Sequence, residues 1–192
     1  TVTVTVEPAP PAGTLPPAPA SVAPPIAPTL ATDFGSANAF LYTGANPIQT
    51  GVAPGTIDPR RAAVIRGRLL DKSNNALPGV TVTLRNHPEY GQTLTRADGR
   101  FDIAVNGGGT LTLHYAKPGL LPAQRQVVVP WLDYAYAGDT ILIGQDARVT
   151  TVDLGNTAPA FHVAQGSVVT GQDGTRQTTL LIPQGTQARV YN

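Results

Sequence analysis

The chain of 192 residues contains no cysteine and no methionine, and only 13% of its residues are charged. The absence of cysteine excludes disulfides, thiolate zinc sites and c-type haem attachment. The net charge is +1, and no basic residue precedes Arg60. Because nucleic-acid binding needs clustered positive charge, we expect no nucleic-acid partner. No apolar run reaches the roughly 18 residues of a membrane span, so we expect no membrane span either.

Glycine and proline are abundant, at 20 and 19 residues, and threonine and valine recur along the whole chain. This composition favours turns and strands over helices. The sequence starts at Thr1 without the basic-then-apolar pattern of a secretion signal. We therefore expect such a signal to have been removed and the protein to lie outside the cell or at its surface.

The first six residues alternate threonine and valine. A period of two predicts a strand with Val2, Val4 and Val6 on one face. A single strand followed by a proline-rich stretch cannot form a sheet, because its backbone groups stay unpaired. We therefore expect these three valines to form an assembly interface, with the strand added to a sheet of this chain or of a neighbouring copy.

Residues 7–28 contain nine prolines. They predict a polyproline II segment that spans on the order of 60 Å. Residues 29–60 are weakly patterned, although Phe34, Phe40, Leu41 and Tyr42 can hold them against a globular body. Residues 1–60 are thus expected to form an extended arm.

Residues 61–146 predict an all-β fold, a small seven-stranded β-sandwich, because short alternating runs follow one another at regular spacing. Turn signals separate the runs, including Asp98-Gly99, which supplies the positive φ of a tight hairpin turn. The expected strands cover 63–70, 80–84, 92–96, 101–105, 110–115, 126–129 and 140–143.

Residues 147–192 predict a short, incomplete C-terminal β segment. We expect a strand at 148–154, a hairpin that pairs 166–169 with 178–182, and a further strand at 187–191. So few strands are short of an independent core. The segment is therefore interpreted as the start of a second domain.

Several motifs carry a family resemblance. Residues 62–143 include Leu77-Pro-Gly-Val-Thr-Val-Thr-Leu84 and Thr93-Leu-Thr-Arg-Ala-Asp-Gly-Arg-Phe101, and this stretch resembles the carboxypeptidase regulatory-like, transthyretin-related β-sandwich. The motifs His87-Pro-Glu-Tyr-Gly91 and Val129-Pro-Trp131 look like the corresponding module of teneurins and of bacterial Rhs/YD-repeat surface proteins. Residues 165–185 look like the beginning of the ZU5-like sandwich that follows in those bacterial proteins. The resemblance implies a non-catalytic spacer outside the cell.

Residues able to carry catalysis or hold a metal are scattered. His87, His114 and His162 lack the spacing of a metal site. Asp98 and Asp102, four residues apart, lack the ligand pattern of a calcium loop, and Asp98 is predicted to cap its own turn. No serine lies in a nucleophile motif. We expect no metal and no cofactor, and we do not expect an enzyme.

Three aromatic residues, Trp131, Tyr134 and Tyr136, lie close together in the sequence. Exposed aromatic rings stack on sugars, so these residues are candidates for glycan contact. In the alternative interpretation, Trp131 caps the sandwich and the two tyrosines decorate an edge strand.

We therefore expect a non-catalytic extracellular structural module that self-assembles into a fibre or surface array. The N-terminal arm would be added as a strand to a neighbouring subunit, and copies of the chain would be its main partners. Two alternatives remain open: a spacer or adhesion module of a large Rhs-type surface protein, and a carbohydrate-binding β-sandwich that contacts a cell-surface glycan or protein.

Overall fold

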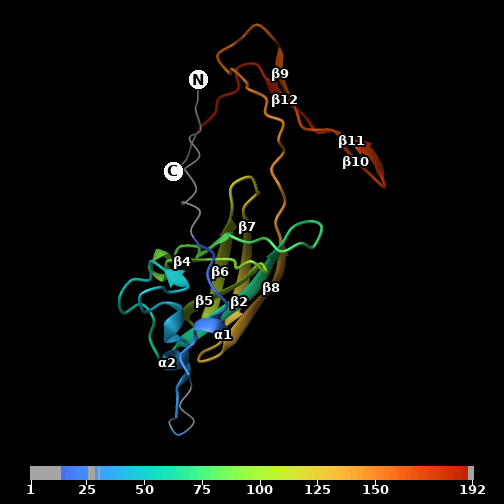
Figure 1. Cartoon of the computed structure of the whole chain (residues 1–192). Coiled ribbons are helices and arrows are strands. Elements are labelled where there is room, and N and C mark those ends of the chain that lie inside the picture. The colour runs from blue at the N-terminus through green and yellow to red at the C-terminus, as the bar shows by residue number, and fades with distance from the viewer. Residues whose placement is uncertain (1–13, 26–28, 30, 190–192) are drawn as a thin grey trace. The chain divides into compact units, whose positions relative to one another are not determined.

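The computed structural model describes residues 14–25, 29 and 31–189. The described chain divides into two compact units, the first ending at Gly144 and the second covering residues 145–189 (Figure 1). Val2, Val4 and Val6, for which an assembly interface was predicted, lie outside the described residues.

The first unit is an all-β sandwich, as the sequence predicts. A five-stranded sheet has the order β1-β4-β3-β6-β7, and a three-stranded sheet has the order β5-β2-β8. The predicted seven strands become eight because a two-residue strand pairs with the edge of β4. The strands are β1 (Gln49–Thr50), β2 (Ala62–Leu70), β3 (Thr81–Leu84), β4 (Gln92–Leu94), β5 (Arg100–Asn106), β6 (Gly109–Ala116), β7 (Ala123–Val129) and β8 (Tyr134–Ile141).

The core lies between the two sheets. In β2, Ala63, Ile65 and Leu69 point inward and are 0% exposed. Leu113 and Tyr115 of β6 belong to the same cluster and are also fully buried. Burying each large apolar side chain contributes roughly 1.5–3 kcal/mol. This period-two division of β2 is what gives the sheet its separate outer face.

The Asp98-Gly99 turn forms, but it does not make the predicted hairpin. Asp98 Oδ1 accepts a hydrogen bond from the Arg100 amide at 2.9 Å, and Gly99 has a φ of 76°. The strands on either side belong to different sheets, because β4 pairs with β3 whereas β5 pairs with β2. The turn residues were thus identified correctly, and the pairing was wrong.

Strand β8 begins earlier than the predicted strand at 140–143, and it places Tyr134 and Tyr136 on an edge strand, as the alternative interpretation of these tyrosines expected. It runs over Tyr134–Ile141, parallel to β2. Its inward residues are Ala135 and Ala137, small side chains with low strand propensity, which hid the pattern. The β2–β8 register shifts at Gly67, where a Cβ would lie 2.7 Å from Cε1 of Phe101. A bulge and a glycine therefore occur together, as expected where a ring crosses a strand.

Residues 31–59 cover one end of the outer face of the three-stranded sheet. They contain α2 (Phe34–Asn38), whose N-cap Asp33 accepts the Ser36 amide at 2.9 Å, and the 3-10 turn η1 (Ala39–Leu41). Leu41 and Ile48 pack on the outward Val64 and Ala104 in a second small core. The expectation that apolar residues at 34–42 hold this segment to the body is confirmed.

Gln49 ties this covering segment to the sandwich. Its side chain is 0% exposed, and its Nε2 donates to the carbonyl oxygens of Tyr90 at 2.7 Å and Ala104 at 3.0 Å. Its Oε1 accepts from the Ala104 amide at 2.6 Å. The buried amide therefore satisfies backbone groups of β5, which is an edge strand of its sheet.

The described part of the proline-rich arm is not polyproline II throughout. Residues 19–22 form a single helical turn, α1 (Pro19–Val22), with proline in its first turn. Ser21 Oγ donates to the carbonyl oxygen of Ala18 at 2.7 Å and supports the turn. Proline in the first turn of a helix costs no hydrogen bond, which reconciles this turn with the composition.

The second unit consists of two ribbons. One pairs β9 (Phe161–Gln165) with β12 (Thr179–Pro183), and the other pairs β10 (Val169–Gly171) with β11 (Gly174–Arg176). The predicted hairpin of 166–169 with 178–182 is therefore wrong, because β12 pairs with the earlier β9. Residues 148–154 and 187–189 form no strand, contrary to prediction, and 190–191 lie outside the described residues.

We expect Gln49→Leu to destabilise the first unit by about 2–4 kcal/mol, because the Ala104 amide and two carbonyl oxygens lose buried partners. Urea unfolding followed by fluorescence measures the change. Gln126→Leu, at an exposed position of β7, is the matched control and should change stability little. Equal effects of the two substitutions would contradict this role of Gln49.

Asp146 makes the second unit sensitive to acid. Hydrogen bonds from the Ser167 hydroxyl and from the Arg148 and Ser167 amides lower the pKa of Asp146 to about 2, below its ordinary 3.8. A carboxylate whose pKa is lowered by folding stabilises the fold above the ordinary pKa, and the benefit is lost as pH falls toward the folded value. We expect the Ser167 amide NMR signal to move as the pH falls below about 3, with its midpoint near pH 2. In Asp146→Asn this pH-dependent movement should disappear.

Candidate functional site

An aspartate and two arginines form an ion cluster on the outer face of the three-stranded sheet. Asp102 of β5 lies directly opposite Arg66 of β2. Its carboxylate accepts from Arg66 Nε at 2.6 Å and from Arg96 Nη1 at 2.5 Å. The side chains of Asp102 and Arg96 are only 4% and 11% exposed, so water screens their attraction weakly. Burial acts against the charge of Arg66, but Asp102 outweighs it and raises the pKa of this guanidinium above its ordinary value.

Tyr134 packs against this cluster. The Arg66 guanidinium carbon lies 3.8 Å from the centre of the Tyr134 ring, and Phe34 meets the same ring edge-on with centroids 5.0 Å apart. The Tyr134 hydroxyl donates to Asn38 Oδ1 at 3.1 Å. Tyr134 therefore links β8 to α2 and to the ion cluster through all parts of its side chain.

Trp131 and Tyr136 are much more exposed, at 61% and 72%. The Trp131 indole lies over the turn before β6, where a Cβ on Gly108 would approach its Nε1 to 1.8 Å. Tyr136 lies in β8, in register with Arg66. The three aromatic residues predicted to contact glycan thus have three different surroundings, and glycan contact by this set stays a prediction.

A hollow of ≈ 280 Å³ adjoins the ion cluster. Arg68 and Arg100 are directly opposite each other in the β2–β5 ladder. Arg68 Nε donates to the carbonyl oxygen of Asp98 at 3.2 Å, and Arg100 Nε lies 3.7 Å from the Asp98 carboxylate. Basic and aromatic side chains predominate on the sheet side of the hollow, and two carboxylates accompany them: Arg66, Arg68, Arg96, Arg100, Phe101 and Tyr136, with Asp102 and Asp139.

The described part of the arm lies along the same domain, with α1 in front of the three-stranded sheet (Figure 1). Ala18, Pro19 and Ala20 line the arginine-rich hollow. Further along, Leu15 Cδ2 would contact a Cβ on Gly79 at 3.6 Å, and residues 14–17 line a second hollow of ≈ 1020 Å³ against the sandwich. Residues 14–20 are therefore held against their own domain.

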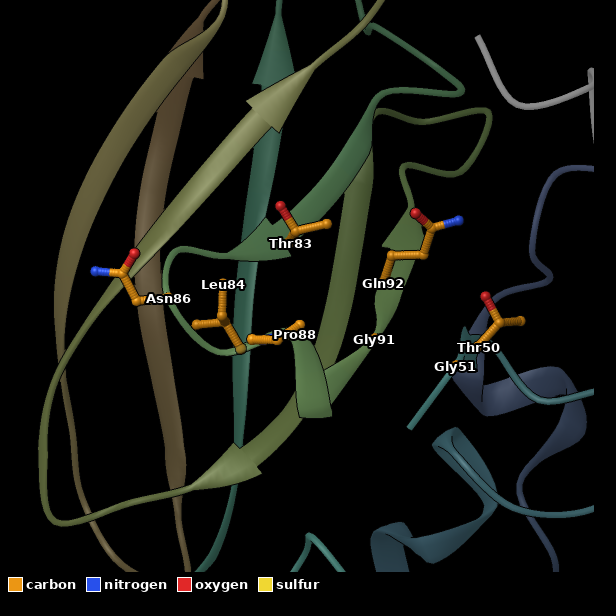
Figure 2. A pocket seen from close by; sticks show the side chains of 8 residues that line it. All are labelled: Thr50, Gly51, Thr83, Leu84, Asn86, Pro88, Gly91 and Gln92. Atoms are coloured by element: carbon orange, nitrogen blue, oxygen red, sulfur yellow. The ribbon is translucent and has the colours of Figure 1, made fainter. Parts of the chain in front are cut away.

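A third hollow of ≈ 510 Å³ lies over neighbouring strands of the five-stranded sheet (Figure 2). Thr83, Gln92 and Thr50 come from β3, β4 and β1, and Pro88 comes from the turn η2 (Pro88–Tyr90). None of the eight lining residues has a side chain that titrates near neutral pH. This hollow can offer hydrogen bonds and apolar contact, but it supplies no general acid or base.

The three histidines do not converge. His87 Nδ1 lies 2.8 Å from Glu89 Oε1, and this hydrogen bond lowers the pKa of Glu89. His114 lies in β6, and His162 lies in β9 of the other unit. Within the described ranges, no three histidine, cysteine or carboxylate side chains lie close enough together to hold a metal. No helix of those ranges is long and apolar enough to cross a bilayer.

Sequence reasoning considered Asp102 only as a calcium ligand and missed its two arginine partners. The signal was present, because Asp102 lies between the inward Phe101 and Ile103 and so had to point outward. Arg66 is outward in β2 by the same alternation. Pairing the two strands in the observed register brings these opposite charges together.

We expect Asp102→Ala to destabilise the first unit by about 3 kcal/mol, because it leaves the buried Arg96 and the partly exposed Arg66 without their counter-ion. Thermal or urea unfolding measures the loss. Asp139→Ala removes an exposed carboxylate from the same face and is the matched control. A small effect at Asp102 would show that water already solvates the cluster.

Comparison with known proteins matches residues 57–142 to the family described as the teneurin TTR-like domain. Teneurin-3 of Mus musculus is 32% identical over 153 residues, which are 79% of this chain and 5% of that protein. Teneurin-m of Drosophila melanogaster is 46% identical over 76 residues, 40% of this chain and 3% of that protein. The chain thus spans only a small part of the length of the relatives it matches.

Among solved structures, a hydroxyquinol 1,2-dioxygenase from Pseudomonas putida DLL-E4 is 11% identical, with a TM-score of 0.38, over 50% of this chain and 60% of that chain. No conclusion about chemistry follows from a likeness of this size. Residues 57–142 form a transthyretin-like β domain of the kind found in teneurin-type proteins.

Proposed function

We propose that this chain is a non-catalytic structural module of a large extracellular surface protein of teneurin or Rhs type. The match of residues 57–142 to the teneurin domain supports the context. The ion cluster carries the argument about chemistry, because both oxygens of Asp102 are already bound by arginines. A carboxylate that is 4% exposed and bound by two arginines positions strands, whereas a general base must come within hydrogen-bond reach of a substrate.

The packing of the arm supports a spacer role. Residues 14–20 lie against the sandwich, and residues 31–59 cover its outer face through Leu41, Ile48 and Gln49. Both segments therefore belong to the domain. A domain built in this way can separate the neighbouring domains of a long chain, and this spacer role requires no ligand.

Accessibility on intact cells tests the location. When the full parent protein is produced by its own cells and those cells are treated with proteinase K, an antibody against residues 61–146 should lose its signal. A cytosolic protein of the same cells should stay intact. Survival of the epitope on intact cells, with loss only after lysis, would place the module inside and contradict the proposal.

Strand addition by residues 1–6 is a second candidate, favoured by the β9–β12 ribbon. Phe161, Val163 and Leu181 share one face and are each at least 50% exposed, and Leu180 on the other face is 58% exposed. An isolated two-stranded ribbon with two apolar faces is marginally stable in water and gains from further strands. In this proposal Val2, Val4 and Val6 supply the apolar side of an added strand, and copies of the chain assemble.

Analytical ultracentrifugation tests this assembly. Val2→Ser, Val4→Ser and Val6→Ser together should convert assembled material to monomer, because the added strand loses its apolar face. The matched control replaces Thr1, Thr3 and Thr5 by serine, which changes the opposite face and should leave assembly intact. If the wild-type chain sediments as a monomer at high concentration, strand addition between copies is wrong.

A further inference from the structure

Two arginines lie opposite each other on the outer face of the three-stranded sheet, and the proposed spacer role does not explain them. Arg68 and Arg100 are direct cross-strand neighbours, and like charges in that position repel each other. Two carboxylates lie near this pair: Asp98 is 55% exposed and reaches Arg100 only at 3.7 Å, and the exposed Asp139 of β8 lies opposite Arg68 in the β2–β8 ladder. Within the described residues, neither carboxylate accepts a hydrogen bond from the side chain of Arg68 or Arg100, so the scaffold matches their charge only loosely. A ligand that carries negative charge would turn the repulsion into binding energy.

Unused hydrogen-bond donors point to the same kind of ligand. A guanidinium has five N–H donors. Arg68 has one hydrogen bond within the described residues, from Nε to the carbonyl oxygen of Asp98. Both oxygens of Asp102 are already bound to Arg66 and Arg96, and Arg96 Nε is buried without a hydrogen-bond partner. The ≈ 280 Å³ hollow beside these groups is therefore rich in donors, and Asp139 is its one lining carboxylate that no arginine binds within the described residues.

Tyr136 indicates which class of anionic ligand fits this hollow. Its ring is 72% exposed and lines the same hollow as the arginines. A flat apolar ring beside guanidinium groups suits a sugar ring that bears a carboxylate or sulfate, because the ring stacks while the anion takes paired N–H donors. A nucleic acid would need a longer basic track, and the net charge of the chain is only +1.

We propose that the outer face of β5–β2–β8 binds an acidic oligosaccharide, with Arg68 and Arg100 on its carboxylate or sulfate groups and Tyr136 against a sugar ring. This site goes beyond the proposed spacer role. It also differs from the predicted aromatic set, because Trp131 and Tyr134 take no part.

The arm defines one wall of this site. Ala18, Pro19 and Ala20 line the hollow, and residues 8–32 carry no charge. The arm therefore cannot neutralise the arginines and leaves them for a ligand. A carboxylate introduced at Ala20 would act as a competitor within the same chain.

Binding to the full chain is measured by isothermal titration calorimetry with a heparin-derived hexasaccharide and with hexagalacturonate, which separate sulfate from carboxylate recognition. Binding of either probe, with none of maltohexaose, is the expected result. The double variant Arg68→Ala, Arg100→Ala should weaken binding at least tenfold. The control Arg60→Ala, Arg176→Ala removes the same charge from exposed sites elsewhere and should change affinity less than twofold.

Two more variants distinguish a loss of binding from a loss of the folded structure. Tyr136→Ala, at a largely exposed position, should weaken saccharide binding severalfold with an unchanged melting temperature. Ala20→Glu should weaken it about tenfold, while Ala23→Glu, on the same arm but outside the hollow, should not.

Three results would overturn the proposal. One is that the wild-type chain binds neither acidic hexasaccharide. Another is equal loss of affinity in the two arginine double variants, which indicates diffuse charge attraction. The third is tighter binding of a ten-residue oligothymidylate or of a polyglutamate peptide than of either saccharide, which assigns the face to another class of partner.

Discussion

Strand β2 imposes the constraint on which the rest of the sandwich depends. It pairs with β5 on one side and β8 on the other, so its side chains alternate between a core and a second face that also needs an environment. The inward residues meet the five-stranded sheet. Val64, Arg66 and Arg68 are the outward residues that follow one another along the strand. Each of them has different surroundings.

The surroundings of these three side chains change from apolar and buried to polar and open to solvent. Val64 lies under Leu41 and Ile48, in a small apolar core completed by the covering segment. Arg66 comes next, with its charge matched by Asp102 and its flat side on Tyr134. Arg68 is last, beside Arg100 and an open hollow. The outer face thus changes from structural to available for binding within five residues of one strand.

The sequence predicts the strands of the sandwich well where large β-branched residues alternate, as in β2, β3 and β5. It predicts them poorly where the inward positions are alanines, as in β8, because propensity and pattern then oppose each other. The pairing of the strands was predicted less well than their positions. A turn such as Asp98-Gly99 has the same local hydrogen bonds whether it connects two strands of one sheet or strands of two different sheets.

The buried polar contacts depend on which strands pair, so the sequence alone did not predict them. Gln49 reads as an ordinary loop residue, and only the long-range position of Ala104 explains its burial. The ion cluster requires the β2–β5 register. In the second unit, residues 148–154 have the pattern of a strand but form none among the described residues, which shows that alternation alone is not sufficient.

The parallel pairing of β2 with β8 has a mechanical consequence. The chain enters the three-stranded sheet at Ala62 and leaves it at Ile141, and parallel strands place these two points at opposite ends of the pair. A pulling force between residues 61 and 142 is therefore directed along the strands. It loads the rungs of the ladder in shear, all at once, where an antiparallel hairpin would open rung by rung. A module threaded in this way resists stretching in proportion to the length of that ladder.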